Sequence, residues 1–137
     1  MKILFVCRGN IGRSQIAEEF FRKYSKHHVS SAGTKADKNG KKVKDIPLAK
    51  DTIQAAKEND ISIAEKDIKQ LTEKMVKDAD KIIVMAEKET FPKFLLNGKK
   101  VIIWKVDNPK HMSKDENKRI VKQIDTLVKK FIRDNNL

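Results

Sequence analysis

Residues 3–14 read ILFVCRGNIGRS, and this short stretch already indicates the class of fold. It opens with four consecutive apolar residues, which is typical of a strand that is buried on both faces of a sheet. A turn with two glycines follows at residues 8–12, and residues 14–24 then carry apolar side chains at helical spacing. A buried strand that passes through such a turn into a helix predicts a parallel α/β sheet.

The rest of the chain continues this alternation of strands and helices. Short apolar runs predict further strands at residues 29–32, 82–85 and 101–104. Helical spacing or helix-start signals predict helices at residues 46–59, 72–78, 87–96 and 113–133. We therefore expect one domain over residues 1–137, with helices on both faces of the sheet and a ligand beyond the carboxyl ends of its strands.

Composition limits the class of protein. No apolar run is long enough for a membrane span or a signal-peptide core, so we expect a cytoplasmic protein with no membrane partner. The single cysteine, Cys7, excludes an internal disulfide and a multi-thiolate zinc site. The formal net charge of +12 attracts anions, from phosphate esters to nucleic acid. With one Trp and one Tyr the chain lacks base-stacking platforms, which makes nucleic acid the least favoured partner.

The turn after the first predicted strand has the composition of an oxyanion site. Gly9 and Gly12 allow the loop to curl so that its N–H groups converge, and Arg13 offers a two-pronged grip on phosphate-like oxygens. Cys7 would lie at the bottom, where the helix N-terminus and the Ser14 hydroxyl stabilise a thiolate. This predicts a nucleophile beneath a bound phosphorus; the alternative is a cysteine that is only a small buried apolar side chain. The predicted anion-binding residues are Arg8, Gly9, Asn10, Ile11, Gly12, Arg13 and Ser14.

Together with other short motifs, this segment resembles the low-molecular-weight phosphotyrosine phosphatase family, including the related thiol-dependent arsenate reductases. The matching motifs span nearly the whole chain: AE at residues 17–18, SAGT at 31–34, QL at 70–71, AD at 79–80, IIVM at 82–85 and DNP at 107–109. The resemblance implies a flavodoxin-like four-stranded parallel sheet of order 2-1-3-4. It also implies hydrolysis of phosphate monoesters through a cysteinyl-phosphate intermediate, without a metal or other cofactor.

The resemblance further implies a role for each matching site residue. Cys7 attacks phosphorus, while Arg13 and the loop amides hold the equatorial oxygens. Ser14 supports the thiolate, and Asn10 with Ser31 fixes the loop shape. The implied partners are a phosphorylated protein or a small phosphate ester, with inorganic phosphate or arsenate as the anion in the pocket.

The position of the general acid departs from the family pattern. The family has an aspartate directly before a proline, whereas here Asn108 precedes Pro109 and an amide cannot supply a proton. Asp107 is the predicted substitute, if the loop turns its side chain inward. The alternative is that Asp107 only caps its own turn.

Two other functions stay open from the sequence. Gln15 and Trp104 resemble the arsenate reductase branch, but that reaction would need an external small thiol because the chain has no second cysteine. A non-catalytic anion or nucleic-acid binder is the third class, and the positive charge and Asn108 favour it.

Overall fold

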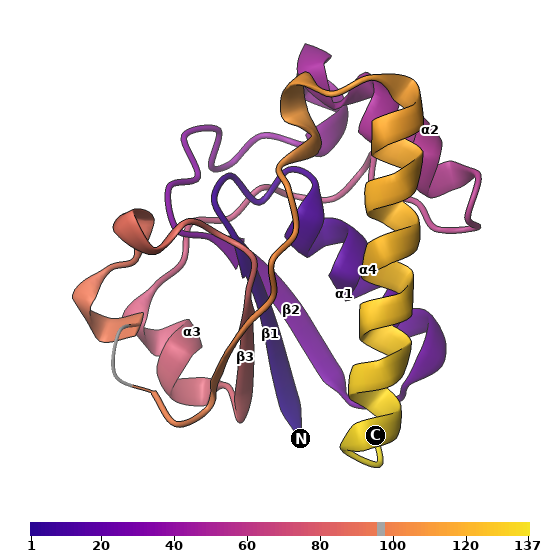
Figure 1. The fold of residues 1–137 in the computed structure, drawn as a ribbon. Helices are drawn as coiled ribbons and strands as arrows, with labels where there is room; N and C mark the ends of the chain where they lie inside the picture. The colour runs from indigo at the N-terminus through magenta and orange to yellow at the C-terminus, as the bar shows by residue number, and fades with distance from the viewer. Residues whose placement is uncertain (96–97) are drawn as a thin grey trace.

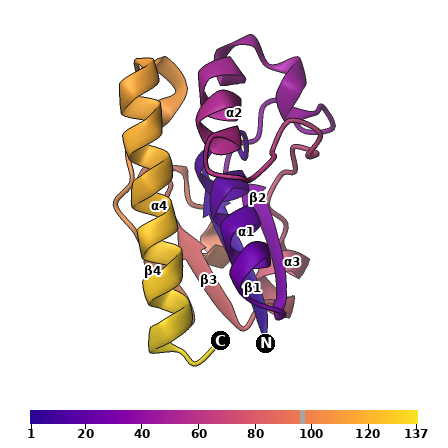
Figure 2. The same ribbon diagram turned by 90° about the vertical axis from the view of Figure 1, so that its right-hand side faces the viewer.

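The computed structural model describes residues 1–95 and 98–137 of the chain. Its centre is a parallel sheet in the order β2-β1-β3-β4, which confirms the predicted strand order (Figures 1 and 2). The strands are β1 (Lys2–Cys7), β2 (His28–Gly33), β3 (Lys81–Val84) and β4 (Val101–Ile103). β1 therefore lies inside the sheet, paired with β2 on one side and with β3 on the other.

Helices cover both faces of the sheet, as predicted. On one side lie α1 (Arg13–Tyr24), α2 (Lys50–Lys57) and α4 (Lys114–Asp134), and on the other lies α3 (Glu73–Asp78) (Figure 1). The hydroxyls of Thr72 and Ser113 cap α3 and α4 by accepting backbone N–H bonds from the first turn of each helix. None of the helices in the described ranges is long and apolar enough to cross a membrane.

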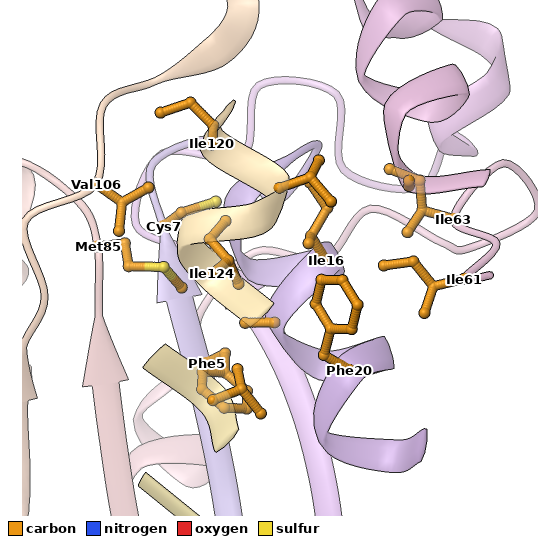
Figure 3. Packing of buried hydrophobic residues seen from close by; sticks show 14 of the residues in the cluster. Phe5, Cys7, Ile16, Phe20, Ile61, Ile63, Met85, Val106, Ile120 and Ile124 are labelled. Atoms are coloured by element: carbon orange, nitrogen blue, oxygen red, sulfur yellow. The ribbon is translucent and has the colours of Figure 1, made fainter. Parts of the chain in front are cut away.

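β1 packs on both faces because successive side chains of a strand alternate. Ile3, Phe5 and Cys7 belong to the apolar cluster beneath α1 and α4, part of which is drawn in Figure 3. Leu4 and Val6 belong to the cluster beneath α3. Each of these five residues is at most 2% exposed, and burial of one large apolar side chain contributes roughly 1.5–3 kcal/mol. The packing anchors Cys7 at the carboxyl end of a central strand.

The predicted helix at residues 87–96 is wrong. The 3-10 turns Lys88–Thr90 and Lys93–Leu95 take its place, and its last residue lies outside the described part of the chain. Pro92 is the cause, because proline lacks an N–H and forces the preceding residue out of the α region. Phe91 accordingly has φ −70° and ψ 128°.

The predicted helix at residues 46–59 is shorter than expected. Ile46 is extended, with φ −101° and ψ 109°, because Pro47 follows it. The 3-10 turn Pro47–Ala49 comes next, and α2 ends at Lys57. Ile46 and the 3-10 turn that follows it, rather than a helix, therefore line the pocket over the first loop.

Candidate active site

The carboxyl end of β1 is the point where the strand order reverses, since the chain continues to β2 on one side and to β3 on the other. Cys7 ends β1 and Arg13 begins α1, so residues 8–12 form a tight loop between them. A pocket of about 510 Å³ opens over this loop. The predicted site residues that line it are Cys7, Arg8, Gly9, Ile11, Gly12 and Arg13. The others in this segment, Asn10 and Ser14, are fully buried.

Asn10 holds the loop in shape. Its backbone is left-handed, with φ 56°, a conformation that asparagine tolerates better than most residues. Its Oδ1 accepts hydrogen bonds from the Lys69 N–H and from Gln15 Nε2, both at 2.9 Å. Its Nδ2 donates to Ser14 Oγ at 2.8 Å and to Ser31 Oγ at 3.0 Å. These contacts are the ones that a loop-supporting role for Asn10 and Ser31 requires.

The sulfur of Cys7 faces hydrogen-bond donors. Its Sγ lies 2.9 Å from Ser14 Oγ and accepts the backbone N–H of Asn10 at 3.3 Å. Figure 3 shows Cys7 in the apolar cluster that also contains Met85 and Val106. The positive end of the α1 dipole lies at the same loop. Donors and dipole together place partial positive charge against the sulfur.

Arg13 is buried, with 3% of its surface exposed. Its Nη1 donates to the main-chain oxygens of Met85 and Val106, the latter at 3.0 Å. Its Nη2 lies 3.7 Å from Glu87 Oε1. Segments that follow β3 and β4 thus fix the guanidinium beside the loop. Sequence reasoning missed Glu87, because nothing in the local sequence marks its approach to Arg13.

The end of β2 supports the loop from the other side. The N–H of Thr34 donates to the Cys7 carbonyl oxygen, and the N–H of Lys35 donates to that of Arg8, both at 2.8 Å. Gly33 packs directly against the loop backbone, where a side chain has no room. In the sequence, Gly33 belongs to the SAGT motif at residues 31–34 and directly follows the predicted strand at residues 29–32. A glycine directly after a predicted strand is the sequence signal for its close approach to the loop at residues 8–12.

The structure does not bring Asp107 into the pocket. Asn108 and Pro109 line the pocket, whereas the side chain of Asp107 is 73% exposed and its Oδ2 lies 4.0 Å from Arg119 Nη2. Two carboxylates that sequence reasoning did not single out, those of Asp37 and Asp45, belong to residues that line the pocket.

The rim of the pocket has a basic and an apolar part. Arg8 and three lysines contribute positive charge, and the apolar lining comes from the segment before α2 and from the loop. The lysines are Lys35, Lys38 and Lys41, and the apolar residues are Ile11, Ile46, Pro47 and Leu48. Such a rim suits an anionic group that carries an apolar substituent.

Comparisons with known proteins agree with this geometry. A family model described as "Low molecular weight phosphotyrosine protein phosphatase" matches residues 2–136. The chain is 36% identical over 84 residues to a Klebsiella pneumoniae protein assigned to the low molecular weight protein-tyrosine-phosphatases. That match covers 61% of this chain and 54% of the Klebsiella protein, so it spans about half the length of that relative.

Solved structures give a similar result over nearly the full chain. Vibrio vulnificus Wzb in complex with benzylphosphonate is 28% identical, with a TM-score of 0.79 and 97% of each chain covered. The low molecular weight protein tyrosine phosphatase from T. tengcongensis is 27% identical, with a TM-score of 0.79 and coverage of 98% of this chain and 99% of that one.

Proposed function

The chain belongs to the low molecular weight phosphotyrosine protein phosphatase family, and we propose that it hydrolyses phosphate monoesters through an intermediate on Cys7. One observation carries the proposal. The Cys7 sulfur lies under a tight loop with Ser14 Oγ at 2.9 Å, and the buried Arg13 guanidinium lines the same pocket. A nucleophile and an oxyanion site therefore meet at one point.

In the first step, the Cys7 thiolate attacks phosphorus. An S–P bond forms, the bond from phosphorus to the ester oxygen breaks, and the leaving oxygen takes a proton. Arg13 and the loop N–H groups stabilise the charge on the equatorial oxygens, and Ser14 stabilises the sulfur when it leaves again. In the second step, water gives up a proton as it attacks phosphorus, the S–P bond breaks, and inorganic phosphate and the thiolate are released.

We assign the proton transfer to Asp107, which adjoins the pocket residue Asn108. Its carboxylate has to leave Arg119 and turn inward, which a loop residue with a largely exposed side chain is free to do. Asp37 and Asp45 are the competing carboxylates, because both line the pocket already. Substitution of each carboxylate in turn separates the three candidates.

The proposed substrates are phosphorylated proteins or small aryl phosphates. The apolar rim formed by Ile11, Ile46 and Leu48 supports an aromatic or other apolar leaving group. The complex of Vibrio vulnificus Wzb with benzylphosphonate, an aryl-bearing phosphate analogue, supports the same class. The lysines on the other part of the rim favour acidic surroundings of the phosphate.

Turnover of p-nitrophenyl phosphate without added metal tests the proposal. Its good leaving group demands little help from an acid, so the wild type should turn over whichever carboxylate is used. Cys7→Ser should abolish turnover and still bind inorganic phosphate. No turnover by the wild type would reject the phosphatase. Arsenite formed from arsenate only with an added small thiol would then favour the reductase.

A further inference from the structure

We propose that Glu18 is a positioning residue that directs a chain of hydrogen bonds toward the Cys7 sulfur. This inference rests on the proposed role of Cys7. The chain runs from the Glu18 carboxylate through Ser31 and Asn10 to Ser14, which contacts the sulfur. Each of its side chains is buried, so water does not compete for the bonds.

The direction of the chain follows from one backbone group. The N–H of Lys69 can only donate, and it faces the side chain of Asn10 at 2.9 Å, so the Asn10 atom at that place is the oxygen. The amide nitrogen of Asn10 therefore faces Ser14 Oγ and Ser31 Oγ. It has two hydrogens and donates one to each hydroxyl.

Each hydroxyl then has a single proton left to place. Ser14 accepts from Asn10, so its own proton is directed to Cys7 Sγ. Ser31 also accepts from Asn10, and its proton goes to Glu18 Oε1 at 2.6 Å, much closer than Gln15 Oε1 at 3.4 Å. An ionised carboxylate can only accept, so Glu18 holds Ser31 in the orientation that keeps Asn10 donating.

Cations surround the buried carboxylate of Glu18. Its side chain is 7% exposed, and its Oε2 contacts Arg22 Nη2 and lies 3.0 Å from Lys66 Nζ. Lys69 adds a third positive charge nearby, although burial lowers its pKa. Glu19 contacts the same Arg22 and Lys66, but its hydrogen bonds do not include Ser31.

Glu19 therefore provides a matched control. Glu18→Ala and Glu19→Ala each remove one carboxylate from Arg22 and Lys66, but only the first removes the acceptor of Ser31. Cys7 is the only cysteine, so its alkylation by iodoacetamide reports on the thiolate without need for a substrate. The alkylation test therefore remains valid even if the wild-type protein shows no phosphatase activity.

In Glu18→Ala, we expect alkylation at mildly acid pH to slow about five-fold, and its pH dependence to shift to higher pH. The acid limb of kcat/KM should shift in the same direction. Glu19→Ala should stay within about two-fold of the wild type. Glu18→Gln keeps the shape of the side chain but allows its amide to donate to Ser31, so it should slow alkylation as well. This variant replaces Glu18→Ala in the test if the alanine variant is poorly folded.

Ser31→Ala interrupts the chain between Glu18 and Asn10 and so completes a double-mutant cycle. In that background, Glu18→Ala should have no further effect on alkylation. Equal alkylation profiles for folded wild type and Glu18→Ala would overturn the proposal. Additive effects of the two substitutions would also overturn it, because they would mean that Glu18 acts by another route.

Discussion

A Cβ atom on Gly33 would lie 2.6 Å from the carbonyl oxygen of Arg8. It would also lie 2.9 Å from the backbone nitrogen of Asn10, and both atoms belong to main chain that cannot rotate away. The last residue of β2 thus has to be a glycine for the loop at residues 8–12 to take its shape.

Gly33→Ala should therefore push the loop out of place. We expect a loss of about 1–3 kcal/mol in the free energy of unfolding and a fall of roughly 10²-fold in kcat/KM. Gly9→Ala is the comparison, since its Cβ would meet only the Ile11 side chain, at 3.5 and 3.7 Å. Denaturant unfolding and phosphatase assays on both variants check the prediction. Equal losses in the two would contradict it.

Arg13→Lys should reduce kcat by about 10²–10³-fold, because an ammonium cannot bond two phosphate oxygens and the carbonyls of Met85 and Val106 at once. The charge is unchanged, so any loss reflects geometry. Arg133→Lys, at an exposed position of α4, is the matched control and should have no effect. Steady-state kinetics with p-nitrophenyl phosphate measures both. A fully active Arg13→Lys enzyme would contradict the proposed anion site.

The residue that protonates the leaving group can be identified from how each substitution affects substrates with different leaving groups. Asp107→Asn should lower the hydrolysis of phenyl phosphate by roughly 10²-fold, and that of p-nitrophenyl phosphate much less, because the phenolate needs a proton more. Asp37→Asn and Asp45→Asn should show no such difference. If the leaving-group dependence appears in one of these two instead, that residue supplies the proton and Asp107 does not.

Tyr24 should titrate far from its usual range. Burial and the hydrogen bond that its hydroxyl donates to Asp125 raise its pKa to about 12. The pKa of Tyr24 is higher in the folded protein than in the unfolded chain, where it is about 10. The contact therefore contributes its full stabilisation below pH ~10, and this is lost as the pH rises through the pKa of the folded protein. The chain has one tyrosine, so the absorbance of tyrosinate reports on it alone. Asp125→Asn should lower the midpoint; an unchanged midpoint would contradict the assignment.

Much of the fold follows from local sequence. The apolar run before Cys7 and the helical spacing after Ser14 predict β1, the loop and α1, and the alternation of strands and helices predicts that the strands are parallel. The order of the strands was predicted only through the family resemblance. The helix predicted at residues 87–96 fails because Pro92 outweighs helical spacing.

From local sequence alone, the site was predictable only where its residues are contiguous, and Ser31 was predicted only through the family resemblance. The loop residues follow one another, but Glu87 reaches Arg13, and Gly33 reaches Arg8, only through the packing of the sheet. In the sequence Glu18 is singled out only as part of the AE motif at residues 17–18, and its contacts with Ser31 and Lys66 join residues far apart in the chain. Contacts of this kind are set by tertiary structure, and among these residues only Gly33 has a local signal, as a glycine directly after a predicted strand.

The most direct test of the account is to trap the covalent intermediate. Wild-type protein is quenched in acid during turnover of p-nitrophenyl phosphate, and the mass of the peptide that contains Cys7 is measured. We expect one added phosphoryl group on Cys7 in the wild type, and none in Cys7→Ser. Turnover by Cys7→Ser, or rapid turnover with the phosphoryl group on another residue, would contradict it.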